Sequence, residues 1–249
     1  MLTEKRKYYT MTESFYRTRL AYIHDTYYGD IARGAAQEIL NHSNTFSLKK
    51  VIDIGCGSGI LASILSQNGK EVIGIDISSD LLEIAKVKSP QTTFIHASLF
   101  DYPFDYADIF CAIGEPFNYL FDEKASYKAL RKILQTIYVH LTPSGLFLFD
   151  ILTDEVETTN NIRIVEKEDI TMFLEISVDA KKEELTRKMT FFIKRNNCYE
   201  KDSETHKQLL FKVDKIEELL AETGFNFQRL TGYNGLEFRK GHYGFICKK

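Results

Sequence analysis

The sequence lacks an excess of charge of either sign. Its 249 residues include 32 Lys and Arg against 35 Asp and Glu, which gives a formal net charge of -3. Proteins that bind nucleic acid through its phosphates usually carry a basic surplus. The near balance therefore disfavours nucleic acid as a partner.

Long apolar runs are missing as well. No segment approaches the roughly 20 apolar residues needed to span a bilayer. The basic residues near the N-terminus are not followed by the apolar stretch of a secretory signal. We therefore expect no membrane partner and a cytoplasmic protein.

Cysteines are few and scattered, at positions 56, 111, 198 and 247. No two of them have the short spacing of a metal-binding pair such as C-x-x-C. In a reducing compartment they should be free structural thiols, and we predict no metal site.

What is present is a regular alternation of strands and helices. Apolar residues at helical spacing predict two helices within residues 12–43. Short β-branched strands then alternate with helices, which predicts right-handed crossovers and a mostly parallel sheet. The predicted strands are 50–54, 71–76, 92–97, 107–113 and 146–151, and the predicted helices are 60–66, 79–88 and about 122–140.

The alternation of strands and helices ends after Asp150. Residues 172–180 and 185–195 alternate apolar and polar side chains, and a further strand-like run covers 206–211. Such alternation is typical of antiparallel strands with one face in water. The sequence thus predicts three parts: an N-terminal helical lid (1–45), an α/β ligand-binding domain (46–160 and 212–249) and an inserted antiparallel β subdomain (161–211).

A glycine-rich turn follows the first predicted strand, in the sequence VIDIGCGSGIL. Gly55, Gly57 and Gly59 have no Cβ atoms, so the backbone can bend sharply and let a ligand approach its N–H groups. Glycine turns of this kind also hold the pyrophosphate of dinucleotides. Here, however, the spacing is G-x-G-x-G instead of G-x-G-x-x-G, and helices precede the turn.

Two acids accompany the turn. Asp53 would repel a pyrophosphate but attract the ammonium and sulfonium groups of S-adenosylmethionine. A nicotinamide-dependent oxidoreductase is therefore the less favoured alternative. Asp76 ends the second strand about 20 residues beyond Gly55, where an acid accepts hydrogen bonds from ribose hydroxyls. A purely local role for Asp76 in the turn is the other interpretation.

These residues resemble a known family. VIDIGCGSG and VIGIDIS resemble motif I and the following acidic loop of class I S-adenosylmethionine-dependent methyltransferases, and DIFCAIGEPFNYL and LTPSGLFLFDI resemble their fourth and fifth strands. The later region resembles small-molecule members, amino-sugar N-methyltransferases among them, that insert antiparallel strands after the fifth strand. The resemblance implies a doubly wound, mostly parallel seven-stranded sheet of Rossmann-like α/β class, with N-terminal helices and a β insertion.

The resemblance also implies a cofactor site, with S-adenosylhomocysteine as the product. The glycines flank the methionine part with Asp53 in support, and Asp76 takes the ribose. An acid of a G-D-x motif often holds the adenine amino group in this family, but Ser98 stands in its place here, so its hydroxyl or the backbone has to do this. The implied set is Asp53, Gly55, Cys56, Gly57, Gly59, Asp76, Ile77, Ser98, Leu99 and Ile113.

Methyl transfer from a sulfonium needs mainly alignment of nucleophile and methyl, and a base only when the nucleophile arrives protonated. The candidate catalytic residues are Glu115, His206 and His24. The candidate substrate-binding residues are Tyr22, Tyr28, Asn118 and Tyr119. His206 could equally be a surface or core histidine, and the tyrosines could pack a helix instead of forming a lid.

We predict transfer of a methyl group to a nitrogen or oxygen of a small-molecule acceptor. A non-catalytic S-adenosylmethionine-binding protein is an alternative. The polar face of the inserted strands could also support a homodimer.

Overall fold

The computed structural model describes residues 16–43, 48–157, 161–196 and 198–249. At its centre lies a seven-stranded sheet with the order β10-β13-β5-β4-β1-β2-β3. Neighbouring strands from β5 to β3 are parallel, whereas β13 runs antiparallel to both β5 and β10. The predicted doubly wound sheet is therefore confirmed. Its strands are β1 (Lys50–Ile54), β2 (Glu71–Asp76), β3 (Thr93–His96), β4 (Ala107–Ala112), β5 (Leu141–Leu152), β10 (Asn226–Leu230) and β13 (His242–Lys248).

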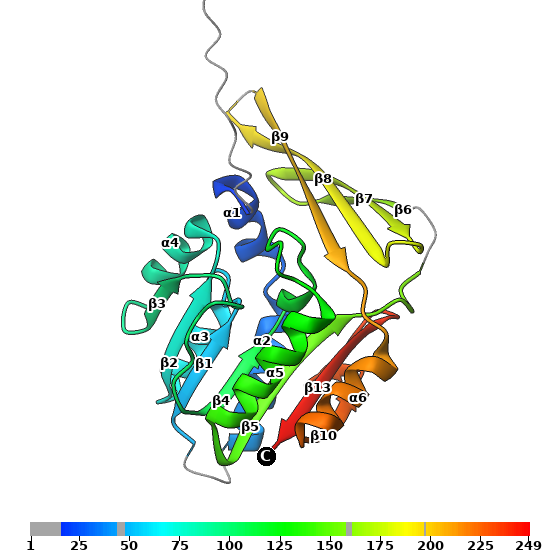
Figure 1. Ribbon diagram of the computed structural model, residues 1–249. Coiled ribbons are helices and arrows are strands. Elements are labelled where there is room, and N and C mark those ends of the chain that lie inside the picture. The colour runs from blue at the N-terminus through cyan, green and yellow to red at the C-terminus, as the bar shows by residue number, and fades with distance from the viewer. Residues whose placement is uncertain (1–15, 44–47, 158–160, 197) are drawn as a thin grey trace, which may run out of the picture.

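Helices cover both faces of this sheet (Figure 1). Alternate residues of β4 explain why, because Ile109 and Cys111 join one buried cluster while Phe110 and Ala112 join another. The first cluster lies under α2 (Asp30–Ser43) and α3 (Ile60–Gln67), with α4 (Ser79–Lys88) beside α3; the second lies under α5 (Tyr127–His140) and α6 (Val213–Thr223). None of the helices within the described ranges is both long and apolar enough to cross a membrane.

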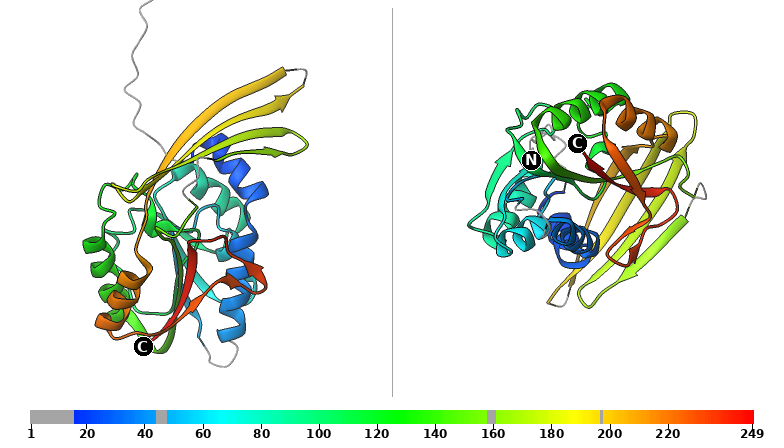
Figure 2. Two further views of the ribbon diagram at one scale, coloured as in Figure 1. Left: turned by 90° about the vertical axis from the view of Figure 1, so that its right-hand side faces the viewer. Right: turned by 90° about the horizontal axis from the view of Figure 1, so that it is seen from below.

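A second, four-stranded antiparallel sheet stands above the carboxyl ends of the parallel strands (Figure 1). It arches over the first helix, α1 (Thr18–Tyr27), as the left view of Figure 2 shows. Met172, Met189 and Phe191 on its inner face pack against Leu20 and Ile23 of α1. Its strands are β6 (Asn161–Glu166), β7 (Ile170–Asp179), β8 (Glu184–Arg195) and β9 (Cys198–Leu209).

Several element boundaries differ from the sequence prediction. Helix α5 begins at Tyr127 instead of near 122, because the Ser126 side chain caps it by accepting a hydrogen bond from the Ala129 N–H. Strand β5 already begins at Leu141, and β9 begins at Cys198 instead of His206. The early part of β9 is polar on both faces, so it has no apolar alternation to reveal it. Strand β6 and the short hairpin of β11 (Gly232–Tyr233) and β12 (Leu236–Glu237) were not predicted.

Candidate functional site

The glycine turn between β1 and α3 has a backbone that requires glycine. Gly55, Gly57 and Gly59 all have positive φ, at 70°, 53° and 71°. A Cβ on Gly55 would lie 2.6 Å from the Cβ of Pro116, which follows β4. The turn is therefore bent in the left-handed region at three alternate residues, as expected from the sequence.

Asp53, next to the last residue of β1, is buried beneath this turn, with 1% of its surface exposed. Its Oδ1 accepts a weak hydrogen bond from the Cys111 thiol at 3.6 Å. Its Oδ2 has no hydrogen-bond partner among the described residues. Burial raises the pKa of Asp53 to about 7, because a buried carboxylate without a partner is costly to ionise. A cationic group bound at the turn would remove that cost, so the site fits the ammonium group of S-adenosylmethionine.

Asp76 closes the turn from the end of β2. Its two oxygens accept hydrogen bonds from the backbone N–H groups of Gly57 and Ser78, each at 2.8 Å. Ser78, and not Asp76, caps helix α4 by accepting from the Leu81 N–H. Each carboxylate oxygen keeps a further lone pair, so the local role and ribose binding are compatible. Ile77 follows as an exposed apolar side chain at this edge.

The loop after β3 has a hydroxyl in place of the family's usual acid. Ser98 accepts a hydrogen bond from the Phe100 N–H at 3.2 Å and donates its own hydrogen to Asp122. Asp122 is buried and comes from the loop between β4 and α5. Leu99 and Ile113 are half-buried nearby in the two loops. A carboxylate therefore lies at this position after all, but it belongs to another segment of the chain.

Glu115 is bound on every side in the loop after β4. Its carboxylate accepts hydrogen bonds from Arg187 at 3.1 and 3.3 Å and from Gln208 at 2.9 Å. Burial raises the pKa of Glu115, but Arg187, His242 and these hydrogen bonds outweigh it and lower the value to about 2. An ionised, fully engaged carboxylate is a poor base near neutral pH. The structure thus argues against the predicted catalytic role of Glu115.

Asp150, near the end of β5, also binds the loop after β4, through its backbone. It is fully buried and accepts hydrogen bonds from the N–H groups of Gly114 and Glu115 and, at 3.3 Å, from the Tyr233 hydroxyl. His242 Nε2 lies 3.3 Å from Asp150 Oδ1, at the distance of an ion pair. Burial lowers the pKa of His242, but Asp150 and Glu115 more than compensate and raise it. Glu115 has a left-handed φ of 65°, and the hydrogen bonds from the Gly114 and Glu115 N–H groups to Asp150 stabilise this conformation.

Aromatic and imidazole rings fill the space between α1, the loop after β4 and β9. The hydroxyl groups of Tyr16 and Tyr119 are 3.0 Å apart. The Tyr16 ring lies 4.7 Å from the His206 ring and 5.1 Å from the His24 ring, measured between centroids. His206 is buried, and its Nε2 lies 3.1 Å from Glu204. The fold thus brings together His24, His206 and Tyr119 from three distant segments.

Two polar atoms in this cluster have no hydrogen-bond partner among the described residues. They are Nδ1 of His24 and Oε1 of Gln208, and both are sealed from solvent. Burial lowers the pKa of His24 to about 4, so its imidazole is neutral at physiological pH. Tyr28 stacks near His24, with ring centroids 6.3 Å apart. A polar ligand with hydrogens to donate would satisfy both atoms.

Two predicted substrate-binding residues do not join this cluster. The amide of Asn118 donates to the Leu152 and Leu209 carbonyls at 2.8 and 2.6 Å and accepts from the Leu152 N–H. Both of its donors and its oxygen are therefore committed to joining β5 and β9. Tyr22 lies on α1 with 47% of its surface exposed. Asn118 is a structural link between the sheets, and Tyr22 faces away.

Sequence reasoning overlooked several residues of the site: Arg187, Gln208, Asp150, Asp122 and Tyr16. One signal could have found the first of them. From Leu185 to Ile193 the inward positions of β8 are apolar apart from Arg187, and a charged side chain in such a series indicates a functional role. Asp150 similarly interrupts the buried apolar run of β5. Asp122 and Tyr16 carry no comparable pattern, since only folding brings them to the site.

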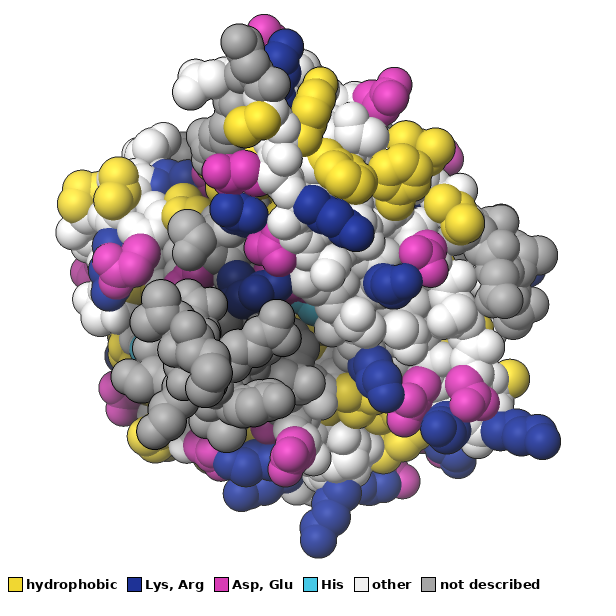
Figure 3. All heavy atoms as spheres, turned by 90° about the horizontal axis from the view of Figure 1, so that it is seen from above, with side chains coloured by type: hydrophobic (Ala, Val, Ile, Leu, Met, Phe, Trp, Pro, Cys, Tyr) yellow, Lys and Arg dark blue, Asp and Glu magenta, His cyan; other side chains and the backbone are white. Residues whose placement is uncertain are grey.

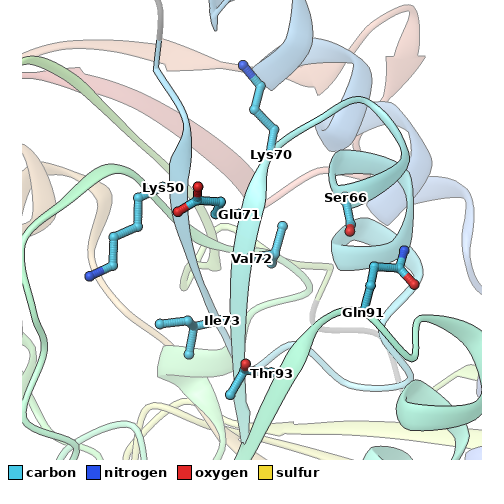
Figure 4. A pocket seen from close by; sticks show the side chains of 8 residues that line it. All are labelled: Lys50, Ser66, Lys70, Glu71, Val72, Ile73, Gln91 and Thr93. Carbon is cyan, nitrogen blue, oxygen red and sulfur yellow. The ribbon is translucent and has the colours of Figure 1, made fainter.

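A shallow pocket lies at the opposite edge of the main sheet, near the amino ends of β1, β2 and β3 (Figure 4). The side chains of Lys50 and Lys70 point away from each other there instead of converging. Ligands of doubly wound sheets bind at the carboxyl ends of the strands, so this pocket is not the candidate site.

Comparisons with known proteins agree with the geometry. Residues 51–145 match the methyltransferase domain family. A protein of Geobacillus sp. (strain WCH70) that is named as a methyltransferase is 28% identical over 220 residues, which cover 81% of this chain and 84% of that protein.

Solved structures show the same fold. The crystal structure of an S-adenosylmethionine-dependent methyltransferase from Clostridium acetobutylicum has a TM-score of 0.78 at 19% identity and covers 92% of this chain and 97% of its own. The structure of a sugar N-methyltransferase from Streptoalloteichus sp. has a TM-score of 0.73 at 16% identity, and the match covers 100% of this chain and 99% of that protein. The matched domain and the sheet order show that this chain carries a methyltransferase domain with the fold of S-adenosylmethionine-dependent methyltransferases.

Proposed function

We propose that this methyltransferase acts on a nitrogen or oxygen of a small-molecule acceptor. The acceptor binds between α1, the loop after β4 and the inner face of the β6–β9 sheet. The observation that carries the proposal is the pair of unpartnered atoms, His24 Nδ1 and Gln208 Oε1, enclosed by these three elements. The fold is shared over the whole chain with the sugar N-methyltransferase from Streptoalloteichus sp., and this similarity supports a small-molecule acceptor.

Bound S-adenosylmethionine supplies a methyl group on a sulfonium, which is already activated for displacement. Asp53 binds the ammonium group and thereby becomes fully ionised. Asp76 accepts hydrogen bonds from the ribose, and Ile77, Leu99 and Ile113 form the apolar surroundings of the adenine. Cys56 fills space within the turn, since burial raises its pKa well above the ordinary value and disfavours a thiolate.

The acceptor side of the site orients the nucleophile. His24 is neutral and accepts the hydrogen of an amine or hydroxyl, and Gln208 accepts the second hydrogen when the nucleophile is a primary amine. These two hydrogen bonds direct the remaining lone pair of the nucleophile toward the methyl group, which is the alignment that an in-line displacement requires. Tyr119 and Tyr16 close the site beside His206, and we propose that α1 forms the lid that excludes water.

Labelled methyl incorporation from a fractionated metabolite extract tests this function. We expect a small product in the wild-type reaction and a loss of roughly 100-fold or more in His24→Ala, on the scale typical of positioning groups. Tyr22→Phe is the matched control on the same helix, and it should react at the wild-type rate. Incorporation confined to RNA or protein would contradict a small-molecule acceptor.

The matched methyltransferase domain disfavours a nicotinamide-dependent oxidoreductase, and the non-catalytic S-adenosylmethionine-binding protein is the alternative that an activity assay excludes. The homodimer and the cytoplasmic location remain predictions.

A further inference from the structure

Two arginines share the inner face of the β6–β9 sheet. Arg163 on β6 lies opposite Leu174 on β7, which in turn lies opposite Met189 on β8. Arg187 is two residues from Met189, so it projects from the same face. Met189 and Leu174 belong to the cluster that packs against α1, which identifies this face as the inner one. Both guanidinium groups therefore start from the surface that covers the site.

A third arginine approaches from the other side. Arg239 lies in the turn before β13, where its carbonyl accepts a hydrogen bond from the His242 N–H at 3.0 Å. The His242 ring lies 3.9 Å from Glu115, the acid that Arg187 binds. Partial burial, and then the charges of Arg163 and Arg187, lower the pKa of Arg239.

The charges at this place are not balanced. Arg187 is neutralised by Glu115, but the side chains of Arg163 and Arg239 form no ion pair or hydrogen bond within the described residues. Every other arginine whose side chain the structure describes has an acidic partner. Figure 3 looks down on this end of the molecule and shows basic side chains lining a hollow beside an imidazole. Within the described residues, Arg163 and Arg239 are thus two guanidinium groups without an acidic partner at this end of the molecule.

We propose that Arg163 and Arg239, with Arg187 behind them, form an anion subsite, and that the methyl acceptor carries a carboxylate or phosphate group. This inference rests on the proposed function and names the substrate class. Guanidinium forks match both anions with paired hydrogen bonds. An anion placed between the arginines would offset their repulsion, while the amine or hydroxyl of the same molecule reaches His24 and Gln208.

Separation of the extract by charge gives the first test. The metabolite extract is divided on an anion exchanger, and each fraction is assayed for labelled methyl incorporation. We expect the accepting activity in the retained, anionic fractions. Phosphatase treatment of those fractions then separates the two chemistries, because it destroys a phosphorylated acceptor and spares a carboxylate. Activity in the unretained fraction overturns the anion subsite but leaves the proposed function intact, whereas no incorporation in any fraction contradicts the function itself.

Substitution gives the second test. Calorimetry measures binding of citrate and of inorganic pyrophosphate to the protein saturated with S-adenosylhomocysteine. We expect at least one anion to bind, and its affinity to fall 10-fold or more in Arg163→Gln/Arg239→Gln. Arg229→Gln, on β10 at the far edge of the main sheet, is the control and should bind like wild type. Unchanged S-adenosylhomocysteine affinity shows that the double variant is folded. Equal anion affinity in the double variant, or no binding by the wild type, overturns the proposal.

Discussion

Two buried carboxylates lie at the same edge of the main sheet in opposite electrostatic states. Asp53 has one oxygen without a partner and a pKa raised by burial to about 7. Glu115 is also buried, yet Arg187 and its other partners lower its pKa to about 2. The difference lies in what surrounds each acid, since burial acts on both.

The comparison separates a binding group from a structural one. Glu115 has its cation supplied by the protein, so it joins the loop after β4 to the β6–β9 sheet in the absence of any ligand. Asp53 lacks a protein cation and can receive one only from a ligand. An incompletely satisfied acid next to a glycine turn is thus more informative about function than a well-paired acid in the same region.

The largest expected effect comes from removing the cation of Glu115. Arg187→Met leaves a buried carboxylate unpaired, which typically costs about 3 to 5 kcal/mol of unfolding free energy. Urea unfolding followed by circular dichroism measures this. Glu115→Gln/Arg187→Met removes both charges and should recover most of the loss. A single variant within about 1 kcal/mol of wild type would show that Glu115 is not held as a buried ion pair.

Titration toward acid gives the next largest effect. The pKa of Glu115 falls from 4.5 to about 2 on folding, so its stabilisation is present above pH 4.5 and is lost as the pH falls toward 2. The shift corresponds to about 3 kcal/mol. Between pH 4.5 and 2 the wild type should therefore lose more stability than Glu115→Gln. Parallel acid limbs in urea unfolding of the two proteins would contradict the paired state.

Asp53 should respond with the opposite sign. Its pKa rises on folding from 3.8 to about 7, so the ligand-free protein loses stability as the pH rises through this range. Asp53→Asn should raise the thermal midpoint at pH 8 and weaken S-adenosylmethionine binding by about 10- to 100-fold, the equivalent of one or two charge-assisted hydrogen bonds.

Binding itself should depend on pH for the same reason. Wild-type affinity for S-adenosylmethionine should rise between pH 6 and 8 as Asp53 ionises, with calorimetry as the measurement. Asp53→Asn should remove this dependence. A variant that keeps both wild-type affinity and its pH dependence would place the ammonium group elsewhere.

The contrast between the two carboxylates also explains which parts of the fold and the site could be predicted from the sequence. The strand, glycine turn and Asp53 are contiguous, so local periodicity and spacing were sufficient to predict the main sheet and the bent turn above a buried acid. The state of Glu115 depends on Arg187 and Gln208, which are 72 and 93 residues away along the chain. No local pattern reports such pairs, so the sequence could not predict that Glu115 is paired and ionised.

Asn118 illustrates the same limit. Its position after β4 suggested a place in the ligand site, but its hydrogen bonds reach β5 and the end of β9. A buried amide that binds backbone carbonyls of two strands is structural, however close it lies to a site. The sequence could place Asn118 in the loop after β4, whereas its hydrogen-bond partners required the fold.

Asp122 is a third acid that extends the comparison, with the smallest expected effect. Its carboxylate accepts hydrogen bonds from Ser98 and, at 3.1 Å, from the Lys124 N–H. We propose that it orients the Ser98 hydroxyl so that the serine oxygen accepts a hydrogen bond from the adenine amino group.

Asp122→Asn should then lower S-adenosylhomocysteine affinity about 3- to 10-fold, near the 1 kcal/mol typical of one hydrogen bond. The affinity for an analogue without the amino group should be unchanged. Calorimetry with both ligands measures the difference, and Asp101→Asn, on the exposed neighbouring loop, is the control. Equal losses for the two ligands would mean that Asp122 supports the loop without recognising the adenine.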